Sequence, residues 1–575
     1  MAYTWTFATS AADQGTDKFR ILAFSGEDSL CQGYRFDILL LAESVTGDNA
    51  QTFLQSMAGA EMHTLSCSAA LNGVNYSFVW NGIPEQVEWL FPLTQGGQIL
   101  RVLLRPTSYK LRQGVHSRIF LGANVPTLLQ NLLVKEGFSL TGAAADASTS
   151  KLLQTYRARP ISCQYNESSY DFLQRHLERV GGYSYIAQSD NNGQDVLVLA
   201  DGAATPDALP VKSALDLDPT GSGAGVVTGF VRTVNPGPAS VILRDYSTDK
   251  PGAEAKTVTP EYAAGSPMNR GAVNYFGMFN MFGEVSLSTG YSAADAQAQA
   301  QLMAQARMRA SVSRSNRIRG ESSVAWMRPG YSITLSGKNY LLLSVNCTGN
   351  YCRSNDDVAA VSRAGDLGFT FDLSRADYSN TFTCHPLEAG SYAPELSTRR
   401  PVVNGLMHAV ITAPAGVGGY ASVDGQGRYK VKFPFPEAVY DAGNNEVTGD
   451  DGYSAPVRMM QANAGAASGI HFPLRKDAEV LVGFTDGDPD RPFIIGAAPN
   501  PGNPSVITDA NNKENIIRTG AQHELVMRDN ADRQEMELLT GAGHSLLFKD
   551  DGDKRVIQLL SSDGENWLKI VEAEK

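Results

Sequence analysis

A 21-residue repeat near the C-terminal end limits what this 575-residue chain can fold into more than any other feature. Residues 519–533 align without gaps on residues 540–554, and seven of the 15 aligned positions are identical. Apolar residues recur every 10 or 11 positions, each within a short strand-like segment followed by Asp, Asn or Gly. This series is Leu525, Met536, Leu546, Ile557 and Leu568. Strand-turn repeats of this kind are typical of β-helices and prisms.

A repeat this short cannot bury its own apolar stripe. Fewer than three complete repeats make a poor single-chain solenoid, because each strand needs neighbours that cover its apolar face. Identical strands from three chains can instead close a three-walled prism with the stripe inside. The sequence therefore predicts a homotrimeric β-prism needle, and the five residues of the series are predicted to form its trimer core.

The rest of the chain is predicted to form several soluble, mainly β domains. At roughly 100–200 residues per domain, this length exceeds a single core. Hydrophobic residues make up 42%, but no apolar stretch approaches the roughly 18 residues of a membrane span. The 55 Gly and 27 Pro indicate many turns and hence many strands. The first residues lack the basic and apolar regions of a secretory signal peptide.

The local pattern changes along the chain. Residues 18–115 alternate between apolar and polar side chains and end in turn formers, as antiparallel strands do. Residues 205–225 lack apolar periodicity and are predicted to be a loop or insertion. From residue 401, about five short strands in about 100 residues fit a Greek-key barrel of the OB type. Helices are predicted at residues 125–133, 168–180 and 293–310.

No enzymatic motif stands out, and we expect a protein that is not an enzyme and has no cofactor or metal. The G-x-S-x-G, P-loop, H-E-x-x-H and C-x-x-C patterns are missing from the sequence. His523 and His544 share a repeat column, which a duplicated polar turn residue explains better than a ring of metal or anion ligands. Residues 550–553 lack the spacing of a calcium loop. Sequence alone leaves a pair of catalytic carboxylates open, because their separation is spatial.

The net charge limits the possible binding partners of the protein, and the number of cysteines indicates its compartment. The 48 Lys and Arg against 60 Asp and Glu give a net charge of −12, which opposes binding to nucleic acid. Six cysteines are too few for a disulfide scaffold and fit a reducing compartment. Cys347 and Cys352 lack the second ligand pair of a zinc site and are predicted to be ordinary thiols.

Several short motifs occur in a fixed order along the chain. They are H-S-R-I-F at residues 116–120, C-Q-Y-N-E at 163–167, M-R-P-G at 327–330, D-G-Q-G-R at 424–428 and G-D-P-D-R-P at 487–492. In this combination they resemble the VgrG family, the spike proteins of the type VI secretion system. The chain departs from the usual family pattern at Ser468, where Trp is common, and at Asp477, where Gly is common.

This resemblance implies a mainly β fold with a few helices, in three parts. Residues 1–395 would form a phage tail-hub-like base of β barrels with helical insertions, residues 400–500 an OB-fold neck, and residues 505–575 a trimeric β-helix needle. The homotrimer would sit on a hexameric Hcp-like tube. Two similar β modules, around residues 18–115 and 320–385, would match its threefold symmetry to the sixfold tube.

The resemblance also implies partners and a route. The spike would carry a PAAR-type tip protein and effector proteins, and it would pierce a target membrane transiently. We expect assembly in the bacterial cytoplasm, followed by secretion through the machine without a signal peptide. Trp567, Leu568 and Ile570 are the predicted tip-binding end, since a prism that stops there exposes strand edges and an apolar cross-section unless a partner or further chain covers them.

A structural puncturing spike is the leading functional hypothesis, and three alternatives remain open. One is the hub and spike of a phage tail or an extracellular contractile injection device. Another is an enzymatic spike acting on the cell wall or on a target protein, although residues 499–515 leave no room for an inserted lysozyme domain. The third is a glycan-binding adhesin, which Trp567, the only Trp beyond residue 327, supports weakly.

Overall fold

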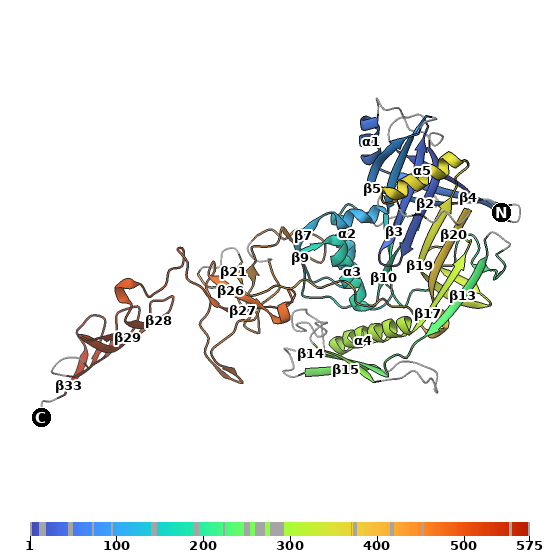
Figure 1. Cartoon of the computed structure of the whole chain (residues 1–575). Coiled ribbons are helices and arrows are strands. Elements are labelled where there is room, and N and C mark those ends of the chain that lie inside the picture. The colour runs from blue at the N-terminus through green and yellow to red at the C-terminus, as the bar shows by residue number, and fades with distance from the viewer. Residues whose placement is uncertain are drawn as a thin grey trace. The chain divides into compact units, whose positions relative to one another are not determined.

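The chain forms two compact units, which are described separately (Figure 1). The first comprises Met1–Leu406, Val423–Arg458 and Gly483–Phe493, and the second comprises Met407–Ser422, Met459–Val482 and Ile494–Lys575. The residues expected to form the neck are thus divided between the two units, and the three-part division by sequence stays a prediction. The computed structural model describes residues 3–10, 19–43, 50–71, 74–93, 96–139, 147–188, 195–221, 225–246, 253–258, 271–276, 293–369, 371, 377–414, 419–449, 453–550 and 555–572.

A twelve-stranded sheet organises the first unit. Its main path runs β1-β4-β5-β6-β3-β2-β19-β20-β17-β13, and β12 and β18 complete it. The strands are β1 (Thr4–Thr9), β2 (Phe19–Ser29), β3 (Gly33–Ala42), β4 (His63–Leu71), β5 (Val74–Pro92), β6 (Gln98–Arg105), β12 (Ala214–Leu215), β13 (Val227–Val234), β17 (Asn316–Ser322), β18 (Ser332–Leu335), β19 (Lys338–Asn350) and β20 (Asp377–Pro386). Because β2 pairs antiparallel with β19, the two predicted modules share one sheet. Their expected likeness to each other stays a prediction.

At β3, both faces of this sheet are buried within the first unit. Successive strand residues point to opposite faces, and in β3 Ile38 and Leu39 are both fully buried. Ile38 belongs to the larger core cluster, which contains Trp80. Leu39 belongs to a separate cluster that contains Val361 and Ala364 of α5 (Asn355–Asp366). A strand that is apolar on both faces is stable only if both are covered, and here one chain covers both.

Three helices overlap the predicted ones. They are α2 (Val125–Lys135), α3 (Ser169–Val180) and α4 (Ala293–Ser315). The Ser168 side chain caps α3 by accepting the Asp171 N–H, and Gly181 ends it in a left-handed conformation with φ of 77°. The sequence analysis missed α1 (Ala50–Ala58) and α5, although α5 begins with a capping box between Ser354 and Asp357.

Smaller sheets complete the first unit. They are β10 (Tyr183–Gln188), β11 (Asp195–Ala200) and β8 (Ala147–Lys151); β15 (Ala253–Val258), β14 (Ser240–Tyr246) and β16 (Ala272–Phe276); and β23 (Ala438–Tyr440), β7 (Val115–Leu121) and β9 (Ile161–Ser168). In the predicted loop at residues 205–225, the described part contains only the two-residue strand β12. All six cysteines are free thiols, as predicted for the pair at 347 and 352.

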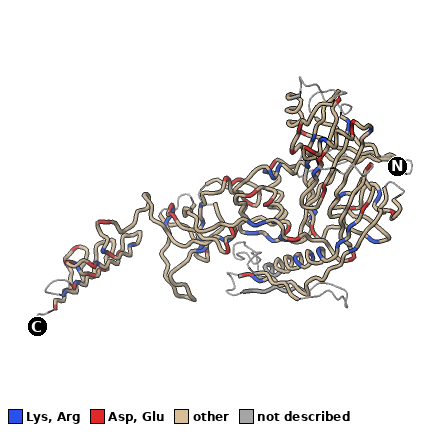
Figure 2. Tube along the Cα trace, viewed as in Figure 1, with Lys and Arg blue, Asp and Glu red and all other residues tan. Residues whose placement is uncertain are grey.

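The G-D-P-D-R-P motif forms a buried ionic contact within the first unit. The Asp490 carboxylate accepts the Cys163 N–H at 2.6 Å and an Arg159 N–H at 3.0 Å. Asp488 accepts from Arg400 at 2.7 Å. Burial raises the pKa of Asp490, and Arg159 opposes this rise. The motif therefore ties its loop to β9 and to the chain just after residue 395. Basic and acidic residues are interspersed along the chain (Figure 2).

The second unit contains strands of the predicted neck and the C-terminal sheet. β21 (Met407–Ile411) pairs antiparallel with β26 (Glu479–Phe484), from Met407 opposite Val482 to Val410 opposite Glu479. A hairpin joins β24 (Ala464–Gly465) to β25 (Ser468–Gly469). The remaining short strands of the neck region are β22 (Val431–Lys432), in the first unit, and β27 (Pro492–Ala497). Among the described residues, no helix is long and apolar enough to cross a membrane.

Candidate functional site: an apolar face on the C-terminal sheet

The last six strands form one antiparallel meander, called here the C-terminal sheet. Each strand pairs with the next along the chain. The strands are β28 (Glu514–Arg518), β29 (Glu524–Asn530), β30 (Arg533–Leu539), β31 (Ser545–Lys549), β32 (Val556–Leu560) and β33 (Trp567–Val571). Their short, even length follows from the 21-residue repeat, which supplies two strands and two turns per period.

The strand register aligns apolar side chains in two rows. On β29 to β33, one row consists of the leucines Leu525, Leu538, Leu546, Leu559 and Leu568. The other row contains Met527, Met536, Phe548, Ile557 and Ile570. On each strand the two members are two residues apart, so both rows lie on the same side of the sheet. These ten residues are called the apolar face.

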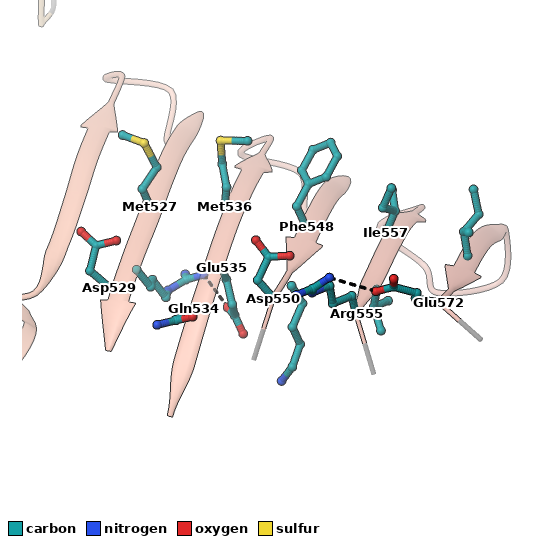
Figure 3. Close-up of a pocket in the computed structure, with 14 residues that line it drawn as sticks. Met527, Asp529, Gln534, Glu535, Met536, Phe548, Asp550, Arg555, Ile557 and Glu572 are labelled. Carbon is teal, nitrogen blue, oxygen red and sulfur yellow. Dashed lines mark hydrogen bonds and ion pairs between the residues drawn. The ribbon is translucent and has the colours of Figure 1, made fainter. Parts of the chain in front are cut away.

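The apolar face is open to solvent in the single chain. Leu568 is 61% exposed, Leu559 54% and Met536 42%. Figure 3 shows Met527, Met536, Phe548 and Ile557 side by side. Scattered exposed apolar residues are ordinary on protein surfaces, but ten in two unbroken rows form a continuous patch, and such patches mark interaction surfaces.

A third row on the same side is polar. It contains Asp529, Gln534, Asp550, Arg555 and Glu572, each two residues from a member of the second apolar row. The second and third rows line a groove of about 870 Å³ (Figure 3). Within it, the Arg555 guanidinium lies 3.3 Å from the Glu572 carboxylate. The groove therefore has an apolar floor with a charged border along one edge.

The opposite side of β28, β29 and β30 is charged. The Arg528 guanidinium contacts Glu537 at 2.9 Å, Glu535 at 3.0 Å and Glu514 at 3.3 Å. Although partial burial opposes the charged form, these carboxylates together raise the pKa of Arg528. Arg528 thus holds together three strands whose acidic side chains would otherwise repel one another. Charged side chains therefore cluster on this side, beside the buried Val526, whereas the apolar face carries none.

All five predicted core residues lie on the apolar face. Along the chain these residues alternate between the two rows. The reason is that adjacent strands run in opposite directions, so a step of 10 or 11 residues does not lead to the residue directly opposite on the next strand. The sequence analysis missed Leu538, Leu559, Met527 and Phe548, and it assigned Ile570 to the tip alone. The i, i+2 spacing of a half-buried strand was the signal that would have found them.

The three predicted tip residues divide between the two sides of β33. Leu568 and Ile570 belong to the apolar face, whereas Trp567 points to the other side and is 66% exposed. Their role at a tip stays a prediction. Among the described residues, no group of three or more His, Cys, Asp or Glu is arranged to hold a metal ion.

Two family models match the chain. The phage tail baseplate hub (GPD) model matches residues 27–350, and the type VI secretion system/phage-baseplate injector OB domain model matches residues 443–498. The first match covers more than half of the chain and most of the twelve-stranded sheet. The second lies in the region predicted from sequence to be an OB fold.

Curated relatives are spike proteins and a toxin. The chain is 26% identical over 504 residues to the type VI secretion system spike protein VgrG1a of Pseudomonas aeruginosa, covering 84% of this chain and 68% of that protein. It is 28% identical over 491 residues to VgrG5 of the same species, covering 83% and 55%. It is 24% identical over 554 residues to the actin cross-linking toxin VgrG1 of Vibrio cholerae, covering 90% and 44%. The chain thus spans about half to two thirds of these relatives.

Solved structures show the same fold at low sequence identity. The E. coli c3393 protein, a component of the type VI secretion system, superposes with a TM-score of 0.54 at 18% identity, covering 86% of this chain and 99% of that one. The lidless PdpA-VgrG complex gives a TM-score of 0.58 at 11% identity, covering 99% of this chain and 98% of that one. At these identities the likeness concerns the fold.

Proposed function

The chain belongs to the phage tail baseplate hub family, and from this premise we propose that it is the homotrimeric spike of a type VI secretion machine. The first unit contributes the hub that sits on an Hcp-like hexameric tube. The C-terminal sheet is one wall of a needle, and three copies close around the apolar face. The spike is assembled in the cytoplasm and leaves through the machine.

The apolar face is the single observation that carries this proposal. Burying a large apolar side chain contributes about 1.5–3 kcal/mol, and seven of the ten side chains of this face are more than a third exposed in the single chain. A partner with the same two rows fits this face, and an identical copy supplies them. Three copies, rather than two, follow from the resemblance to VgrG spikes. Leu525, Met536, Leu546, Ile557 and Leu568 then lie in the trimer core with the five other members of the face.

The arrangement suits a part that transmits force. In a closed prism the backbone N–H and C=O groups are paired between strands, so pushing along the axis loads many hydrogen bonds together. The ion pairs of Arg528 hold three strands of each wall together. The ionic contact of Asp488 and Asp490 with Arg400 and Arg159 fixes the start of the neck to the hub.

The role is structural, and the activity of any toxin is carried by other proteins or other domains. The Vibrio cholerae relative has an actin cross-linking toxin name, but this chain spans only 44% of its length. Effectors are proposed to bind to the spike and to be carried with it. The PdpA-VgrG complex of Francisella is an example of another protein bound to a VgrG protein. A PAAR-type tip protein is proposed to cover the free end at Trp567, Leu568 and Ile570.

Two binding experiments with the full chain test this function. The tube protein from the same genome should bind the spike as one hexameric ring per three chains, measured by native mass spectrometry. Deleting residues 561–575 should abolish binding of a PAAR-type tip protein from that genome and leave ring binding intact. A chain that does not bind the ring contradicts the hub assignment, and equal tip binding with and without these residues moves the tip site elsewhere.

A phage tail or extracellular contractile device is the second candidate, because the family models describe phage baseplates as well as type VI systems. The same ring experiment separates the two. Binding to the tube protein of a phage-like gene cluster, in preference to an Hcp-like protein, would favour this candidate.

A further inference from the structure

Three equivalent turns lie along one end of the C-terminal sheet. They occupy residues 519–523, 540–544 and 561–566 and connect β28 to β29, β30 to β31, and β32 to β33. In each turn the first residue donates its N–H to the carbonyl of the last, at 2.8–2.9 Å, and its hydroxyl accepts the N–H of the last, at 3.0–3.1 Å. The last residues are His523, His544 and Asn566.

Each histidine joins its turn to the next one. The Gly541 N–H donates to Nδ1 of His523 at 3.2 Å, and the Ser562 N–H donates to Nδ1 of His544 at 3.1 Å. The turns are closely stacked, since a Cβ built on Gly541 would lie 2.1 Å from the Ala521 carbonyl oxygen. The repeated histidine, which the sequence analysis explained as a duplicated polar residue, therefore links consecutive repeats through the same bond.

These two bonds require neutral imidazoles. To accept a backbone N–H, Nδ1 must be unprotonated, which places the ring proton on Nε2. An imidazolium carries N–H donors on both nitrogens and cannot accept. Proton uptake, which histidines undergo in the mildly acidic range, therefore replaces each bond with two facing donors.

We propose that the two hydrogen bonds accepted by His523 and His544 hold the three turns together at neutral pH and break in mild acid. These two bonds are called the latch. The unfolded turn takes up protons without losing a bond, so opening becomes easier as the pH falls. The proposal concerns the C-terminal sheet alone and does not depend on the function proposed above.

Charged groups around the two histidines differ. At the first turn, Arg518 pairs with Glu524 on the adjoining strand ends, and Arg475 lies close to Gly520. At the third turn the acids are Asp563 and Glu565. Hydrogen bonds from Ser561 and the Glu565 N–H, and to a smaller extent the charge of His544, lower the pKa of Asp563. The carboxylate of Asp563 thus lies in the turn that His544 contacts, whereas the strand ends beside His523 carry the Arg518–Glu524 pair.

Hydrogen exchange of the intact protein, read by mass spectrometry, tests the latch. Peptides covering residues 540–544 and 561–566 are followed at about pH 7.5 and about pH 5.5, with rates corrected for intrinsic exchange. In the wild type, protection should fall about fivefold or more in mild acid, the fold-change of one lost hydrogen bond. In the His523→Asn, His544→Asn variant it should stay constant, because the Asn oxygen accepts the same N–H and does not titrate; Asn566 already occupies the equivalent place in the third turn.

Two further variants complete the experiment. The His523→Ala, His544→Ala variant should show low protection at both pH values, because the acceptor is gone. His408→Asn, which changes another exposed histidine of the same unit, should behave as the wild type in these peptides. Equal wild-type protection at both pH values, an equal fall in the Asn variant, or full protection in the Ala variant would each overturn the proposal.

Discussion

The twelve-stranded sheet of the hub and the C-terminal sheet differ in how their apolar side chains are covered. In the hub, β3 buries Ile38 on one side and Leu39 on the other, and a single chain supplies both covering layers. In the C-terminal sheet, two rows of apolar side chains face water, and nothing in the described part of the chain packs over them. At β3 the hub thus covers both faces of its sheet within one chain, whereas the apolar face of the C-terminal sheet is left uncovered.

The two parts therefore depend on different contacts for their stability. The hub's core depends on sequence-distant segments of one chain, such as α5 packing on β2 and β3. The needle has only adjacent strands and short turns, so its local pairing forms readily but leaves its apolar side uncovered. Hub stability should therefore be independent of protein concentration, and needle stability should depend on it.

The largest expected effect comes from placing a charge on the apolar face. Leu546→Asp puts one carboxylate per chain into the closed prism, where lost burial, desolvation and repulsion add together. We expect the needle to lose its trimeric state and its protease resistance. Gln558→Asp, on the opposite side of the neighbouring strand, is the matched control and should change neither property. Unchanged light scattering and proteolysis in Leu546→Asp would show that this face does not point inward.

A cavity in the hub should act differently. Leu39→Ala removes a fully buried side chain next to α5 and should cost about 2–5 kcal/mol of unfolding free energy. Denaturant unfolding should show the same loss at low and high protein concentration, with trimer mass retained below the transition. A loss that depends on protein concentration would mean that the hub, like the needle, is completed by other copies.

The sequence predicted the structure of the C-terminal sheet better than that of the hub. In the needle, the repeat revealed the strands and half of the apolar face, because the relevant neighbours are 10 or 11 residues apart. In the hub, the alternating pattern indicated strands, but the pairing of β2 with β19 joins residues more than 300 positions apart and leaves no local trace. Helix α5 was overlooked within a region assigned to strands, although the Ser354–Asp357 capping box marks its start.

In both regions, the sequence did not predict which charged side chains form the buried ionic contacts. The G-D-P-D-R-P motif supported the resemblance, but nothing in it indicated that Asp490 would meet the Cys163 N–H. Arg528 lies at an unremarkable place in the repeat, where the second copy has Lys549. Its three acidic partners come from two neighbouring strands, and only the register brings them together.

Removing that guanidinium should have a moderate effect. Arg528→Met keeps most of the side-chain volume but leaves Glu514, Glu535 and Glu537 without their shared cation, at a cost of about 1.5–3 kcal/mol. We expect a lower thermal midpoint for the needle with its trimeric mass retained. Arg533→Met, at a more exposed pair with Glu535, is the control and should change little. Loss of the trimer in Arg528→Met would place this side at the interface between chains.

The smallest expected effect concerns acid stability in the hub. The Arg20 guanidinium lowers the pKa of Asp357 to about 2, and the Arg353 N–H contributes. A carboxyl whose pKa is lowered by folding adds stability above its unfolded pKa of about 3.9, and this is lost as the pH falls toward 2. Asp357→Asn should therefore shift the urea midpoint at neutral pH and have a diminishing effect below about pH 4.

Asp356→Asn, an exposed neighbour in the same helical turn, should shift the midpoint less and without this acid dependence. An Asp357→Asn effect of equal size at neutral and strongly acidic pH would show that the carboxylate charge does not contribute to stability.

The molar mass of the full chain in solution tests the central claim most directly. Light scattering after size-exclusion chromatography should give about three times 61.8 kDa, because we propose that three copies close around the apolar face of the C-terminal sheet. A single mass of 61.8 kDa that holds over the accessible concentration range would contradict the account, since a stable monomer would have to keep ten apolar side chains in water.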